Sequence, residues 1–218
     1  MFPLEWVLLP GEELSLRIFE LRYTTLVGEL MRSTDPTFGV VLIARGREVG
    51  GGEQRCDVGA LATITQCSDL GSGRYLLRCQ VGDRIRVQEW LPDDPYPRAT
   101  AEVWPDDPGN PLSDRQFRDV EGRIVALLQR IAEARGTRFV PGRSAVLGVR
   151  RRKLAALPPG RRLYALAARV PMGEADRYAV LSAASLTDRL KALHEAVDTV
   201  AAMVEFQLSS GGSPPRGH

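Results

Sequence analysis

The strongest constraint on the fold is a change of hydrophobic period at a proline-rich segment. Residues 105–111, Pro-Asp-Asp-Pro-Gly-Asn-Pro, contain three prolines. Before this segment, apolar residues tend to alternate with polar ones, which is typical of half-buried strands. After it, apolar residues recur every three or four positions, as they do along one face of a helix. The sequence therefore predicts an α+β chain with a β-rich part at residues 1–108, a helical part at 109–208 and a disordered tail at 209–218.

The β-rich part is expected to hold about six short strands and one early helix. Strands are predicted at Trp6–Leu9 and Phe38–Ile43, among other apolar or alternating segments. Helical spacing predicts a helix over Phe19–Met31. Gly82–Asp83 is predicted to be a two-residue hairpin turn between two strands. Strands at this spacing predict a small barrel or a strongly curled sheet.

The helical part begins at a clear start signal. Ser113 and Gln116 fit a capping box, and the helix that they open should end at Gly136. Shorter helices are predicted around residues 144–156, 161–169 and 174–184. The last helix has heptad spacing at Leu186, Leu190, Leu193, Val197, Val200 and Val204. We interpret this stripe as packing inside a helical bundle, with a homo-oligomer formed through the same helix as the alternative.

No combination of residues supports catalysis, a cofactor or a metal. Gly50–Gly52 are not followed by the lysine and hydroxyl that a phosphate-binding loop needs. His194 and His218 are the only histidines, so a metal centre is not predicted. Neither Lys153 nor Lys191 has a buried setting next to a presented serine. We therefore expect a non-enzyme. The N-terminus lacks a basic secretory signal and no stretch approaches roughly 18 apolar residues, which predicts a cytoplasmic protein without a membrane partner.

The charge of the chain is divided unevenly. Residues 1–112 carry 11 basic and 17 acidic residues, a net charge of −6, whereas residues 113–218 carry a net charge of +8. The basic run Arg150, Arg151, Arg152 and Lys153 is a candidate anion-binding patch, since such a run binds nucleic-acid phosphates by releasing counterions. No aromatic set is interleaved with it, which favours a solvated face or a docking surface. Nucleic acid is the less favoured partner.

A second candidate site lies where a predicted strand leads into the early helix. Charged and aromatic side chains alternate there, at Arg17, Phe19, Glu20, Arg22 and Tyr23. Glu20 is expected to cap the helix or to pair with one of the two arginines. The functional alternative is that these residues rim a peptide-binding groove.

A series of short motifs, taken in order, resembles the N-terminal, substrate-binding domain of Lon proteases, including its stand-alone versions. In the β-rich part the motifs are Phe2–Leu4, Val7–Gly11, Leu16–Glu20 with Arg22 and Tyr23, Phe38–Ile43, Gly46–Val49, Val58–Gly59, Ala62–Ile64, Gly73–Tyr75, Gly82 with Arg84–Val87, and Pro95–Tyr96 with Ala99. In the helical part they are Asp176–Leu181 and Leu186–Leu190. The resemblance implies a PUA-like β-barrel followed by a helical bundle.

The resemblance also implies a function. In Lon proteases this domain recognises unfolded or tagged proteins and hands them to an ATPase and a Ser–Lys peptidase, neither of which is expected in this chain. We therefore expect a non-catalytic, polypeptide-binding module of bacterial protein quality control. It would bind unfolded or tagged clients through an exposed apolar groove, as an adaptor or chaperone-like protein working with a separate ATPase or protease. The cereblon-type degradation receptor shares the barrel and suggests an adaptor by analogy. The alternative is an RNA-binding PUA-like protein that uses the basic helical half.

Overall fold

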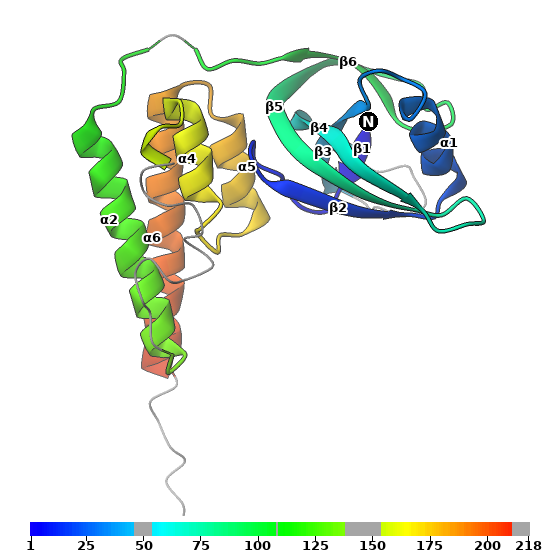
Figure 1. Cartoon of the computed structure of the whole chain (residues 1–218). Coiled ribbons are helices and arrows are strands. Elements are labelled where there is room, and N and C mark those ends of the chain that lie inside the picture. The colour runs from blue at the N-terminus through cyan, green and yellow to red at the C-terminus, as the bar shows by residue number, and fades with distance from the viewer. Residues whose placement is uncertain (46–53, 108, 138–153, 211–218) are drawn as a thin grey trace, which may run out of the picture. The chain divides into compact units, whose positions relative to one another are not determined.

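The computed structural model describes residues 1–45, 54–107, 109–137 and 154–210. The chain divides into two compact units, Met1–Asp106 and Asp107–His218. Within the described residues the first unit holds six strands and one helix, and the second holds four helices (Figure 1). The predicted α+β class, with a β-rich part, a helical part and a long last helix, is confirmed. No helix in the described part is long and apolar enough to cross a membrane.

One curled sheet forms the first unit. Its strands are β1 (Phe2–Leu4), β2 (Glu13–Ile18), β3 (Thr37–Arg45), β4 (Gln54–Asp69), β5 (Tyr75–Leu91) and β6 (Arg98–Val103). The strand order is β1-β3-β4-β5-β2, and β6 also pairs with β5. β1 runs parallel to β3, whereas the other neighbouring strands are antiparallel. Figure 1 shows the long strands β4 and β5 bending across the unit, as a small, strongly curled sheet requires.

The predicted hairpin turn at Gly82–Asp83 is wrong, because β5 continues through both residues. Ala60 pairs with Arg84 and Ala62 pairs with Val81, so Gly82 and Asp83 together lie opposite the single residue between Ala60 and Ala62. This is a β-bulge, which bends a strand without ending it. On its other edge β5 pairs with β2 before the bulge and with β6 after it. The glycine that suggested a turn therefore marks the point where β5 changes partners.

The predicted strand at Trp6–Leu9 is also wrong. The strand at this end of the chain is Phe2–Leu4, and Val7–Leu9 form a buried loop, whereas Trp6 is exposed. Leu9 is fully buried, and its N–H donates a hydrogen bond to Glu12 Oε2 at 2.7 Å. A side-chain carboxylate thus satisfies a buried backbone donor that a strand would have paired in a ladder. The run is apolar because it is covered.

The early helix, α1 (Leu21–Leu30), lies within the predicted range and packs onto the sheet. Its buried residues Tyr23, Leu26 and Val27 belong to the same core cluster as β1 and β2. The Tyr23 ring stacks on Phe2 with 4.1 Å between ring centroids. In β2 buried and exposed residues alternate strictly, so one face of the strand contributes to this core and the other faces solvent.

The second unit is a helical bundle. Its helices are α2 (Asp114–Ala134), α4 (Pro159–Ala167), α5 (Glu174–Ser182) and α6 (Leu186–Ser210). The predicted capping box forms, since Gln116 N–H donates to Ser113 Oγ and Ser113 N–H donates to Gln116 Oε1. The predicted helix at 144–156 falls mostly outside the described residues. Of the heptad stripe, Leu190, Leu193, Val197, Val200 and Val204 are buried in the bundle, so they are not available to a coiled coil with a second chain.

The close contact between β3 and β4 at Gly59 gives a testable prediction. A methyl group at this position would overlap the carbonyl oxygen of Val40 and lie 2.7 Å from Val41 Cγ1. We expect Gly59→Ala to lower the free energy of unfolding by about 3 kcal/mol, because two paired strands would have to separate. Gly28, inside α1, has open space around it. The control Gly28→Ala should raise the free energy of unfolding by about 0.5–1 kcal/mol. Denaturant unfolding measures both, and equal effects would contradict the pairing described here.

Candidate functional site

The predicted segment Arg17–Tyr23 is divided between surface and core. Arg17 and Phe19 are exposed, and Phe19 retains 63% of its accessible area. Tyr23 is 2% exposed and belongs to the core, so it cannot contact a partner directly. Glu20 occupies the N-cap position of α1 but makes no side-chain cap hydrogen bond. Its carboxylate instead accepts a hydrogen bond from Arg22 Nε at 3.1 Å, which is one of the two predicted pairings.

The topology brings Phe19 close to the hairpin between β4 and β5. Tyr75 pairs with Ile18 on one side and with Asp69 on the other. Phe19 and Leu70, the next residues along β2 and β4, therefore follow strand ends on either side of Tyr75, about 10 Å apart. The hairpin is also tied to α1, because Thr24 Oγ1 donates a hydrogen bond to the Gly73 carbonyl oxygen at 2.8 Å.

Three exposed apolar side chains gather at this end of the sheet. Leu21, the first residue of α1, is 81% exposed, and Leu70 is 53% exposed. We call Phe19, Leu21 and Leu70 the apolar tip. Large apolar side chains scattered singly over a surface need no explanation, whereas contiguous exposed groups of them are typical of interaction sites, which makes the tip a candidate. Figure 1 shows the β4–β5 hairpin and α1, the elements that bear these residues, side by side at this end of the unit.

The loop that carries Leu70 has a fixed backbone conformation. Gly71, Ser72 and Gly73 have φ values of 79°, 56° and 70°, three consecutive residues in the left-handed region. Two glycines adopt this conformation without steric cost. Leu70 N–H donates to the Arg74 carbonyl oxygen at 2.8 Å, which closes the loop directly after Leu70. The position of Leu70 is thus set by the turn.

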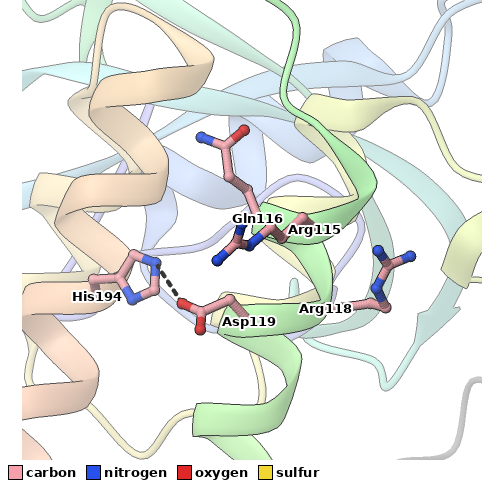
Figure 2. A pocket seen from close by; sticks show the side chains of 5 residues that line it. All are labelled: Arg115, Gln116, Arg118, Asp119 and His194. Carbon is pink, nitrogen blue, oxygen red and sulfur yellow. Dashed lines mark ion pairs between the residues drawn. The ribbon is translucent and has the colours of Figure 1, made fainter.

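A polar hollow lies between α2 and α6 in the helical unit (Figure 2). It has a volume of about 480 Å³ and is lined by Arg115, Gln116, Arg118, Asp119 and His194. Figure 2 shows Asp119 pointing toward His194 and Arg118 pointing away from it. His194 Nε2 lies 3.8 Å from Asp119 Oδ2. On the other side of the ring, Arg123 Nη1 lies 2.6 Å from Nδ1.

The surroundings of His194 disfavour the protonated form of its imidazole. Burial lowers the pKa of His194 below its ordinary value, and the Arg123 guanidinium lowers it further. Asp119 and Asp198 act in the opposite direction but are outweighed. Arg123 also pairs with Asp198, so this histidine belongs to a chain of contacts that joins α2 to α6. Among the described residues, the lining of the hollow comprises two arginines, a glutamine, an aspartate and the histidine, with no serine, cysteine or lysine for His194 to activate.

The other predicted candidate, the basic patch Arg150–Lys153, lies outside the described residues. No group of three or more side chains suited to holding a metal ion occurs in the part of the chain that the structure describes.

Comparison with known proteins identifies the family. The family model described as the ATP-dependent protease La (LON) substrate-binding domain matches residues 1–199. The chain belongs to this family. Its members are non-catalytic, substrate-binding domains, so the prediction of a substrate-recognition module of the Lon type is confirmed.

Solved structures agree with this assignment. The crystal structure of a Lon N-terminal domain protein from Xanthomonas campestris is 26% identical, with a TM-score of 0.58, covering 89% of this chain and 95% of its own. The N-terminal domain of the Mycobacterium avium complex Lon protease shares the fold at 14% identity and a TM-score of 0.56, covering 90% of this chain and 96% of its own. No protein with a curated description matches the chain.

The low pKa of His194 predicts how stability depends on pH in this Lon-family chain. As pH falls below about 6.5, the ordinary histidine pKa, the unfolded chain binds a proton at this site before the folded chain does. The free energy of unfolding should therefore fall as pH decreases from 7 to 5. In His194→Gln this part of the pH dependence should disappear. Thermal unfolding at several pH values measures it. An identical pH dependence in both proteins would contradict the lowered pKa.

Proposed function

We propose that this Lon-family domain binds unfolded or tagged polypeptides through the apolar tip, without catalysing a reaction on them. The observation that carries the proposal is the exposure of Phe19, Leu21 and Leu70 at one end of the sheet. An unfolded client exposes the apolar side chains that a folded protein buries. Contact between two such surfaces removes apolar area from water on both sides, and this supplies the free energy of binding.

The frame that holds the tip supports this role. The side chains are exposed, but the backbone beneath them belongs to β2, α1 and the β4–β5 hairpin, all joined through Tyr75 and Thr24. A preformed surface loses little conformational entropy when it binds. The client, by contrast, loses entropy on binding, so we expect modest affinity for any single segment.

An adaptor or chaperone-like role follows from the same surface. A module that holds a client without altering it can act only by presenting the client to another protein. As an adaptor, this module would present the client to a separate ATPase or protease. The RNA-binding alternative depends on Arg150–Lys153, outside the described residues, and no observation on the described residues adds to it.

The decisive experiment is a fluorescence-anisotropy titration with a labelled, permanently unfolded protein, reduced and carboxymethylated α-lactalbumin. We expect saturable binding that persists when salt is raised from 50 to about 300 mM, because apolar contacts are not screened. Phe19→Ser and Leu21→Ser should each weaken binding about tenfold, which corresponds to one buried apolar side chain. Unfolding temperatures should stay unchanged, because both side chains are exposed in the free protein.

Met31 provides the matched control. It is 49% exposed and directly follows the C-terminal end of α1, about 15 Å along the helix axis from Leu21. Met31→Ser therefore removes a comparable apolar side chain away from the apolar tip and should leave affinity unchanged. Equal affinity in all four proteins would overturn the assignment to the tip. Absence of binding by the unaltered protein would overturn the function.

A further inference from the structure

Among the strands that the structure describes, β6 is paired along one edge. It pairs with β5 through its whole length, and no other strand in the described residues pairs with it. Five of its six residues are exposed, and the remaining one, Ala99, is half-buried. Both faces of β6 are therefore largely uncovered. An edge of this kind presents backbone N–H and C=O groups in the spacing that another strand requires.

The hydrogen bonds at the end of β6 show which backbone groups point outward. Trp104 N–H donates to the Arg84 carbonyl oxygen at 2.9 Å, and the Trp104 carbonyl oxygen accepts from Arg84 Nε at 2.7 Å. Both backbone groups of Trp104 thus point toward β5. Since direction alternates along an antiparallel strand, the groups of Glu102 and Thr100 also point toward β5. Those of Val103, Ala101 and Ala99 point away from it.

The three outward positions carry small, uncharged side chains. Val103 lies opposite Ile85 and Ala101 lies opposite Val87, and both of these β5 residues are buried. Cross-strand partners share a face of the sheet, so the side chains of Ala101 and Val103 continue the core side of the sheet out to its edge. Val103 is nevertheless 53% exposed there. The charged residues Arg98 and Glu102 lie on the opposite face.

In the part of the chain that the structure describes, the outward positions of β6 carry little protection against pairing. Proteins block exposed edges with proline, with charged side chains, with bulges on the edge strand or with a covering loop, and the charges of β6, Arg98 and Glu102, lie at the other positions. The bulge in this strand pair adds its extra residue to β5, between Val87 and Glu89, and not to β6. The side chains of β6 on the core side of the sheet are alanine and valine. An incoming strand would find hydrogen-bond partners at Ala99, Ala101 and Val103, and an apolar strip on the core side of the sheet.

We propose that the outer edge of β6 binds an extended polypeptide segment as an additional strand. The segment pairs its backbone with Ala99, Ala101 and Val103, and every second side chain, being apolar, covers Val103 and Ala101. The inference rests on the proposed function for its class of occupant, an unfolded polypeptide, but it names a different site and a different mode of binding. Backbone pairing of this kind is a recurrent way of recognising extended peptides.

The test uses the full chain and a fluorescein-labelled peptide of ten alternating valine and threonine residues with two lysines at each end. We expect saturable binding, and slower hydrogen exchange by NMR at the amides of Ala99, Ala101 and Val103. The amides of Thr100 and Glu102 already bond to β5, so their exchange should change little. Two N-methylated versions of the peptide, one methylated at the odd residues and one at the even residues, define the two registers. Binding should be abolished in one register and spared in the other, because only alternate N–H groups face β6.

Two variants of one residue separate backbone from side-chain effects. Ala101→Pro removes an N–H that points to solvent, so the β5–β6 ladder keeps its bonds, and affinity should fall about fivefold. Ala101→Ser keeps the N–H and should bind like the unaltered protein. Unchanged exchange at the three amides at saturating peptide, or equal loss in both N-methylated registers, would overturn the proposal.

The same experiment distinguishes this inference from the proposed function. If Phe19→Ser weakens binding of unfolded α-lactalbumin while Ala101→Pro leaves the binding of both probes unchanged, the apolar tip stands and the β6 site is wrong. If the three amides are protected without peptide and the protection depends on protein concentration, the edge of β6 pairs with a second copy of the chain. In that case the β6 edge is not a client site, and the apolar tip is unaffected.

Discussion

The partner exchange along β5 is the constraint on which the surfaces of the first unit depend. A single strand of 17 residues holds β2 beside its first part and β6 beside its last part, and the bulge at Gly82–Asp83 separates the two. Because β2 pairs with the beginning of β5, it ends beside the β4–β5 hairpin, and this places Phe19 near Leu70. Because β6 pairs with the end of β5, its other edge is left without a strand in the described part of the chain. Removing the bulge would change both surfaces together.

Local sequence pattern predicted most of the elements but not their pairing. The capping box at Ser113 and the heptads of α6 each depend on residues close in sequence, and each is found as predicted. The prediction of a hairpin turn at Gly82–Asp83 failed for a physical reason. A glycine followed by an aspartate is compatible with a hairpin turn and with a bulge, and the choice was made by Ala60 and Ala62, some 20 residues away, which pair across the bulge.

The candidate site was found only in part for the same reason. The predicted segment Arg17–Tyr23 lies at the same end of the sheet as the proposed apolar tip, and Phe19 follows the outward phase of β2. Tyr23 shares a helical face with Leu26 and Val27, three and four residues on, and its stacking on Phe2 places it in the core rather than on the surface. Leu21 did carry a local signal, because it lies outside the helical face shared by Tyr23, Leu26 and Val27. Leu70 carried none, since its proximity to Phe19 depends on the pairing of three strands.

The apolar tip and the β6 edge would recognise two different properties of one kind of partner. In the proposed function the tip binds apolar side chains, and in the further inference the edge binds backbone N–H and C=O groups. A folded protein buries the first and pairs the second within its own secondary structure, whereas an unfolded chain exposes both. Neither property requires a particular sequence. A domain that uses both surfaces would therefore select clients by their conformational state, and two weak contacts on one flexible chain would add to a useful affinity through effective concentration. Such selection needs no catalytic group.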